Sequence, residues 1–209
     1  NKMPLIEQRK IAKKDPIYIP DKDFQAMMQI DQLDDFYKRV FLLYRETGMR
    51  LREPFIATLN GSWIDILPET KTKVERSIEV SELIKAIFLE LKDWQLNGYG
   101  STIKDPGEHL SKVFKQYFKQ VSVNANIHFH SLRHTFAVRQ VLMGVPIYDV
   151  KLRLGHASVT TTEQYSNMNL KRVAQDFPDL ERPPTLMPKM AMEDTVLEGI
   201  KGNVSNYLK

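Results

Sequence analysis

The chain has 209 residues, of which 42% are hydrophobic and 27% charged, the balance of an ordinary globular domain. It contains no cysteine, which excludes disulfides, cysteine-ligated zinc and thiol catalysis, and no apolar run approaches the roughly 20 residues that cross a bilayer. The net charge of +4 is small. The lack of cysteines and of an apolar signal segment favours a cytoplasmic protein without a membrane partner.

Three regions are expected along the chain. Residues 1–20 contain three prolines and little periodicity, which is typical of a linker or arm. Residues 21–180 form the main domain. Residues 181–209 form a tail that begins in a proline-rich connector.

The first half of the domain combines helices with a hairpin. A helix is predicted in "PDKDFQAMMQI", with Asp21 as its N-cap. A second, in "DDFYKRVFLLYRETG", keeps its apolar residues on one face and stops at Gly48. Residues 60–66 and 73–80 alternate apolar and polar side chains, so they predict an antiparallel hairpin around "LPETKT".

Helices are predicted for the rest of the domain. They cover residues 81–94, with Ser81 as a cap, and residues 106–121, 131–143, 147–153, 158–166 and 169–176. The predicted fold class is therefore α+β, mostly α-helical, with a small antiparallel hairpin or sheet at one edge. In the tail, apolar residues recur at spacings of three and four and predict one amphipathic helix near 191–208: Met192, Val196, Leu197, Ile200, Val204 and Leu208.

Positive charge gathers in two places. The sequence "RKIAKK" at residues 9–14 is one, and the stretch from 104 to 153 is the other, where only Asp105, Glu108 and Asp149 oppose eight basic residues. Such a surface suits a nucleic acid, although a solvated helix face explains it equally well. The eight are Lys104, Lys112, Lys115, Lys119, Arg133, Arg139, Lys151 and Arg153.

Six polar residues together could transfer a phosphoryl group. Two arginines can hold the oxygens of one phosphate and neutralise the charge of its transition state. A tyrosine hydroxyl becomes a nucleophile when a histidine takes its proton, and a lysine can protonate the departing oxygen. This chemistry needs no metal. The six are Arg50, Lys71, His130, Arg133, His156 and Tyr165.

A metal site is the alternative for part of this set. His128, His130 and His134 lie close together in the sequence, but it offers no matching carboxylate.

The motifs "TGMRLREP", "TKTKVERSIEV" and "HSLRHTFAVRQVLMGVPIYDVKLRLGHASVTTTEQY", within about residues 47–165, resemble the catalytic domain of the tyrosine recombinases, the phage-integrase family. The resemblance implies that Arg50, Arg133 and His156 hold the phosphate. It further implies that Tyr165 is the nucleophile, His130 its proton acceptor and Lys71 the general acid. Lys73 competes with Lys71 for this last role. Ser131 and Pro54 depart from the family's usual residues.

The resemblance also implies a function. It is site-specific recombination or integration of double-stranded DNA through a 3′-phosphotyrosine, without a cofactor, by a tetramer. The family's N-terminal DNA-clamping domain is not expected in this chain. The tail is expected to dock on a neighbouring protomer, and packing on its own domain is the alternative. A type IB topoisomerase and a non-catalytic DNA-binding module are the alternatives, and the second would be expected to lack some of the six residues.

Overall fold

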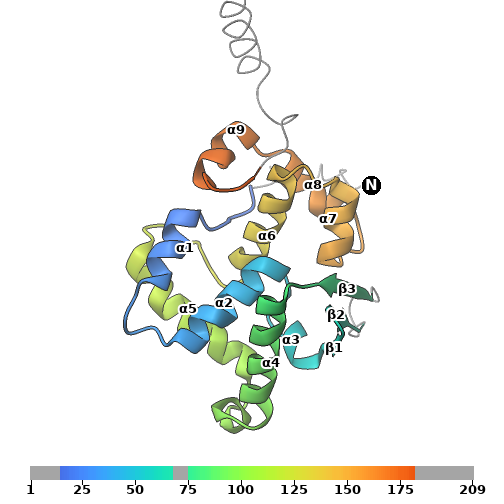
Figure 1. Ribbon diagram of the computed structural model, residues 1–209. Coiled ribbons are helices and arrows are strands. Elements are labelled where there is room, and N and C mark those ends of the chain that lie inside the picture. Colours follow the sequence, from blue (N-terminus) through green and yellow to red (C-terminus); the bar gives the residue numbers. More distant parts are fainter. Residues whose placement is uncertain (1–14, 68–74, 182–209) are drawn as a thin grey trace, which may run out of the picture.

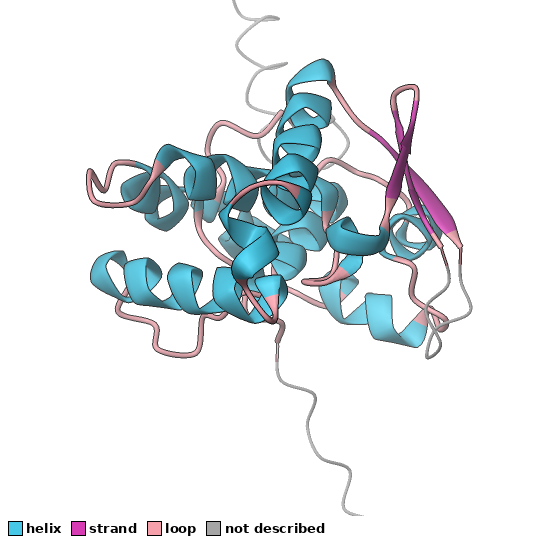
Figure 2. Ribbon diagram, turned by 90° about the horizontal axis from the view of Figure 1, so that it is seen from below, coloured by secondary structure: helices cyan, strands magenta, loops and turns pink. Residues whose placement is uncertain are grey.

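The computed structural model describes residues 15–67 and 75–181. This part is mostly helical, with a three-stranded antiparallel sheet at one edge, so the predicted fold class is confirmed (Figures 1 and 2). The basic arm at 9–14, Lys71, Lys73 and the predicted tail helix lie outside the described residues. Among the helices described, none is long and apolar enough to span a membrane.

An N-cap residue precedes the first helical residue, but helix α1 (Asp21–Met28) already includes Asp21. Pro20 is the N-cap and Asp21 is already helical, so the predicted cap was wrong. Asp21 is buried instead, and its carboxylate binds the Arg45 guanidinium of helix α2. The Asp21 carboxylate thus makes a charge-assisted bond to a neighbouring helix and does not bond the backbone of its own helix.

Helix α2 (Asp35–Thr47) agrees with its sequence signals at both ends. The Asp34 side chain accepts a hydrogen bond from the Phe36 amide at 2.7 Å and caps the first turn. Gly48 ends the helix with φ +63°, a left-handed conformation that glycine adopts without a steric cost. The chain then turns toward helix α3 (Glu53–Ile56).

The sheet has the strand order β1-β2-β3. The predicted hairpin is present as β2 (Trp63–Ile66) and β3 (Arg76–Glu79), paired so that Ile64 faces Ile78. Strand β1 (Thr58–Asn60) was not predicted, because three residues are too short for alternation to show. It pairs with β2 across a turn at Gly61.

The remaining elements follow the predicted order, and Ser81 caps its helix as expected. Among the described residues, the short 3-10 helix η1 was not predicted. The elements are α4 (Glu82–Leu96), η1 (Tyr99–Thr102), α5 (Pro106–Val121), α6 (Ser131–Leu142), α7 (Ile147–Leu154), α8 (Thr160–Ser166), α9 (Leu170–Val173) and η2 (Ala174–Asp176).

The buried side chains form two hydrophobic clusters that meet along α6. The larger cluster lies among α1, α2, the sheet, α4 and α5 and ends at Leu132. The smaller begins at Phe136 and joins α6 to α7, α8 and α9. Polar side chains on α6 between these clusters therefore lie where two parts of the fold meet.

Residues just before α1 contact both clusters, with Ile19 in the larger one and Tyr18 against the smaller one. The Ile19 side chain is fully buried, and its backbone amide donates to Thr135 Oγ1 on α6 at 2.8 Å. The Tyr18 hydroxyl donates to Asp176 Oδ2 at 2.7 Å. The chain thus enters the domain alongside the elements that follow α8.

The Gly48 turn gives a test of the fold. A Cβ at Gly48 would lie 2.5 Å from Phe136 Cδ1, whereas a Cβ at Gly61, with a similar φ of +61°, would meet nothing within 4 Å. Gly61→Ala should cost roughly 1–2 kcal/mol for the left-handed backbone. Gly48→Ala should cost about 1–3 kcal/mol more because it overpacks the core. Urea unfolding of both variants checks this, and equal losses would show that Phe136 moves aside freely.

Candidate active site

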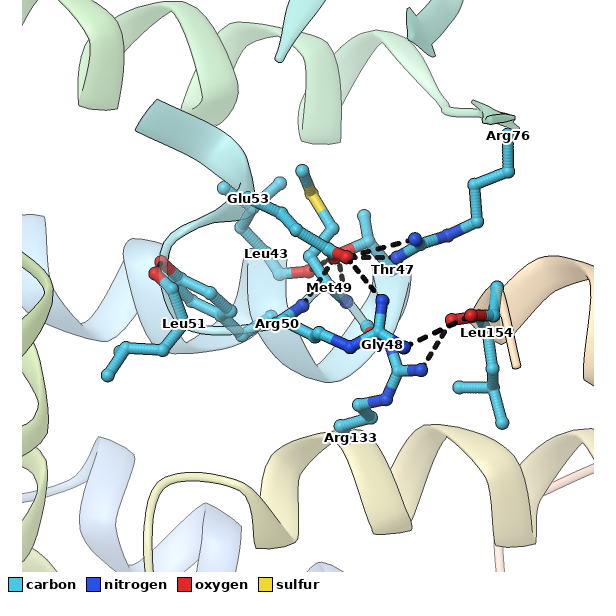
Figure 3. Close-up of polar contacts among 12 residues, drawn as sticks. Leu43, Thr47, Gly48, Met49, Arg50, Leu51, Glu53, Arg76, Arg133 and Leu154 are labelled. Carbon is cyan, nitrogen blue, oxygen red and sulfur yellow. Dashed lines mark hydrogen bonds and ion pairs between the residues drawn. The ribbon is translucent and has the colours of Figure 1, made fainter. Parts of the chain in front are cut away.

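A buried carboxylate organises the arginines of the site. Glu53 is 6% exposed and lies between Arg50 and Arg76 (Figure 3). Its Oε1 accepts hydrogen bonds from Arg50 Nη1 at 2.7 Å and Arg76 Nη1 at 2.9 Å. Its Oε2 accepts from the Arg50 backbone amide and from Arg76 Nη2, both at 2.6 Å. Both oxygens are therefore shared between two cations from different elements.

The local sequence explains why Glu53 lies here. The left-handed turn at Gly48 reverses the chain, and the Glu53 amide bonds the Arg50 carbonyl at 3.0 Å to start α3. Pro54 lies in the first turn of α3, where its missing amide hydrogen costs nothing. The departure at Pro54 thus fits the helix that follows Arg50.

The second arginine ties the two halves of the domain together. Arg133 is 2% exposed and donates from Nη1 to the Gly48 carbonyl at 2.7 Å and from Nη2 to the Leu154 carbonyl. Arg50 Nη2 donates to the Gly155 carbonyl at 3.0 Å. Both guanidinium groups thus bridge the end of α2 and the end of α7 (Figure 3).

Gly155 is required at this junction for two reasons. Its φ is +63°, which ends α7 in a left-handed turn. A Cβ at this position would also lie 2.7 Å from Arg76 Nη1. The glycine therefore lets the backbone before His156 approach the arginine cluster closely.

The cluster keeps an excess of positive charge. Burial lowers the pKa of Arg133 to about 9, helped by the charges of Arg50 and Arg76, and the group stays protonated at neutral pH. Burial alone would raise the pKa of Glu53, but the bonds from Arg76 and Arg50 hold it at about 2. Three guanidinium charges against one carboxylate suit a phosphate ligand.

Two predicted histidines border this cluster as neutral rings. Desolvation and the nearby Arg133 and Arg50 lower the pKa of His130 to about 4 and that of His156 to about 3. His156 Nδ1 lies 2.9 Å from Thr162 Oγ1 of α8. Neutral imidazoles can accept a proton or donate a hydrogen bond without adding charge.

Tyr165 projects from α8 into the smaller cluster and is 2% exposed. Burial raises the pKa of its hydroxyl to about 12, although the charge of Arg133 acts to lower it. The hydroxyl lies 2.8 Å from Nδ1 of His134 on α6. A nucleophilic role would need a nearby proton acceptor, because so little of this group ionises at neutral pH.

Five of the six predicted residues thus lie around the meeting point of α2, α6, α7 and α8. The sixth, Lys71, falls in 68–74, outside the described residues, as does its competitor Lys73. The metal alternative finds no support, since among the residues described no three His, Cys, Asp or Glu side chains could hold an ion together.

Sequence reasoning missed Glu53, Arg76 and the contact of His134 with Tyr165. Arg76 carried a signal, because it falls on the buried face of the predicted strand 73–80, and a buried arginine needs a partner. Glu53 had no such signal, since an acidic residue near a helix start is ordinarily exposed.

The basic residues between 104 and 153 do not all lie on one surface. Arg133 is buried in the site, and Arg139 pairs with Glu46, so neither forms a free basic surface. Three lysines on the outer side of α5 are exposed and line a shallow depression together with Gln116 and Gln120: Lys112, Lys115 and Lys119. Of these, Lys112 also pairs with Glu108 at 2.8 Å. The exposed lysines of α5 fit both expectations, a surface for a nucleic acid and a solvated helix face.

Residues 18–172 match the model of the phage integrase family. The tyrosine recombinase XerD of Staphylococcus epidermidis is 26% identical over 194 residues, covering 83% of this chain and 65% of that protein. The crystal structure of the XerA recombinase superposes with a TM-score of 0.61 at 18% identity, covering 84% of this chain and 67% of that one. The XerH site-specific recombinase bound to its difH substrate superposes with a TM-score of 0.60 at 20% identity, covering 80% of this chain and 54% of that one.

The family match includes the arginine cluster, the histidines and the tyrosine, and the chain belongs to the phage integrase family. It covers less than two thirds of the length of the XerD relative.

The Glu53 cluster predicts an acid-sensitive stability. The folded pKa of about 2 lies below the ordinary value of 4.5, so the stabilisation is complete above about pH 4.5 and is lost as the pH falls toward 2. The shift corresponds to ~3 kcal/mol. Glu53→Gln should therefore lower the free energy of unfolding by about that amount at neutral pH, and this deficit should shrink between pH 4.5 and 2.

Urea unfolding at several pH values measures the deficit, with Glu79→Gln on the exposed side of β3 as the matched control. A deficit that stays constant down to pH 2 would show that the carboxylate is not held by the arginines.

Proposed function

We propose that this chain is the catalytic domain of a site-specific DNA recombinase or integrase, which cleaves and rejoins strands through a 3′-phosphotyrosine. One observation carries the proposal. The buried Tyr165 hydroxyl lies 2.8 Å from the neutral His134 ring, and the charge of Arg133, part of a cluster of arginines that retains positive charge, acts on it. This arrangement supplies a nucleophile, a phosphate-binding site and proton acceptors together.

In the proposed reaction the Tyr165 oxygen attacks the scissile phosphorus and the bond to the 5′-oxygen breaks. Arg50, Arg133 and His156 hold the non-bridging oxygens and neutralise the charge of the transition state. Lys71 protonates the 5′-oxygen, and a neutral histidine, His130 in the sequence prediction, takes the phenol proton. A 5′-hydroxyl from a partner strand reverses the step, so the reaction needs neither a cofactor nor ATP.

Double-stranded DNA is the proposed partner. The exposed lysines of α5 would contact the phosphate backbone, which positions a protein on a duplex without reading its sequence. The XerH relative was crystallised with its difH DNA substrate, which supports the same class of partner. The proposed assembly is a tetramer on paired sites, in the bacterial cytoplasm at the nucleoid, serving integration or excision of a mobile element. Residues 181–209 would dock on a neighbouring protomer.

Two alternatives make different predictions. A type IB topoisomerase would relax supercoils as one subunit and exchange no strands between duplexes. A non-catalytic DNA-binding module would form no covalent bond. The presence of all six expected residues in the sequence favours a catalytic site, because a non-catalytic module would be expected to lack some of them.

The nucleophile is tested with a nicked suicide substrate, from which the cleaved end is lost and the covalent complex accumulates. Tyr165→Phe should keep DNA affinity and abolish the complex, because only the hydroxyl is removed. Tyr148→Phe is the matched control, since Tyr148 is 64% exposed on the neighbouring helix α7. An adduct that persists in Tyr165→Phe, or one that maps to Tyr148 or Tyr207, would refute the assignment.

A 5′-bridging phosphorothioate substrate separates Lys71 from Lys73. Its thiolate leaving group needs no general acid. A variant that lacks the acid should therefore cleave the phosphorothioate substrate at nearly the wild-type rate. Lys71→Ala should cleave normal DNA slowly, by roughly 10²-fold or more, and the sulfur substrate at nearly the wild-type rate. If this rescue appears for Lys73→Ala alone, the acid is Lys73.

A further inference from the structure

His134 makes a contact that the six predicted residues do not explain. It follows Arg133 on α6 and lies about one turn beyond His130. Its Nδ1 lies 2.8 Å from the Tyr165 hydroxyl, with the two ring centroids 5.9 Å apart. His134 is partly buried and Tyr165 is 2% exposed, so the contact is largely shielded from water. A proton that leaves this hydroxyl therefore needs a protein group to receive it.

The exposed His130 contacts His134. The two rings meet edge to face, with centroids 4.9 Å apart and planes at 88°. The His134 backbone amide also bonds the His130 carbonyl at 3.2 Å. His130 thus supports the His134 ring, and His134 supplies the nitrogen at the hydroxyl.

His134 is in the protonation state that a proton acceptor needs. Burial, then His130, His128 and Arg133, lower the pKa of the His134 ring to about 4. These groups and Tyr165 are the titratable and charged side chains that face it. At neutral pH the ring is uncharged, and Nδ1 can offer its lone pair to the hydroxyl while Nε2 carries the hydrogen. The charge of Arg133 also acts to lower the pKa of the Tyr165 hydroxyl, which favours loss of its proton.

We propose that His134 is a further catalytic residue, which accepts the hydroxyl proton of Tyr165 as the phenol oxygen attacks the scissile phosphate. The proposal rests on the proposed recombinase function. As the bond from oxygen to phosphorus forms, the proton moves to Nδ1 and gives an imidazolium. The bond to the 5′-oxygen breaks, and that oxygen takes a proton from the lysine acid.

The transition state carries extra negative charge on the phosphate oxygens, which offsets the cost of a new cation beside Arg133. When the strands rejoin, the imidazolium returns its proton to the tyrosine oxygen.

The test measures single-turnover formation of the covalent complex on a nicked duplex, with enzyme in excess, between pH 6 and 9. His134→Ala should slow the reaction by about 10²-fold or more without weakening DNA binding. Its rate should rise with pH, because solvent hydroxide replaces the lost base, whereas the wild-type rate should stay flat over the range above the His134 pKa of about 4. Added imidazole should restore part of the rate by filling the space left by the ring.

His134→Gln keeps much of the side-chain volume and a hydrogen-bonding oxygen but cannot take up a proton at these pH values. It should fold like the wild type, stay slow and show no rescue. His128→Ala, an exposed neighbour in the preceding loop, is the matched control and should retain the wild-type rate.

Three results would overturn the proposal. The first is a His134→Gln rate equal to that of the wild type. The second is a faster reaction in His134→Ala, which would mean that the contact only restrains Tyr165. The third is a His130→Ala variant whose cleavage is slow, rises with pH and is restored by imidazole, while His134→Ala cleaves at the wild-type rate. If the wild-type chain itself forms no covalent complex, the recombinase function fails, which is a separate outcome from these three.

Discussion

The site depends on one carboxylate that is buried among cations. Without Glu53, the buried Arg76 and the adjacent Arg50 would repel each other and Arg133 inside the protein, and burying unpaired charges is costly. With Glu53 they form a fixed unit that joins the end of α2, α3 and strand β3. The positive charge that remains acts on Tyr165 through Arg133, so the bonds that hold the fold together also suit a phosphate ligand.

The position of this unit explains why distant segments meet. Arg133 and Arg50 bond backbone carbonyls at the end of α7, and Arg133 also bonds the end of α2. The two hydrophobic clusters are thereby linked through polar bonds at the place where Tyr165 lies. The same surplus of positive charge, together with burial, keeps His130, His134 and His156 neutral, and neutral histidines are what proton transfer at a tyrosine requires.

Much of this could be predicted from the sequence because its signals are local. Helix periodicity, the cap at Ser81 and the stop at Gly48 all depend on neighbouring residues, and each was confirmed. The failures are non-local. Asp21 bonds Arg45 on another helix and does not cap α1. Glu53 is buried because it bonds Arg76, which lies on a strand 23 residues away in the sequence. The choice between His130 and His134 at Tyr165 needs the relative rotation of α6 and α8, which spacing along one helix does not give.

A double-mutant cycle on cleavage tests most directly whether Glu53 and Arg76 act together to align Arg50. The rate of covalent-complex formation would be measured for Glu53→Gln, Arg76→Gln and the double variant, each shown to be folded. Each single change should slow cleavage by roughly tenfold or more, about 1.4 kcal/mol of transition-state stabilisation. The double variant should lose little beyond either one, because both changes break the same unit. A Glu53→Gln variant that cleaves at the wild-type rate, or losses that simply multiply in the double variant, would contradict this account.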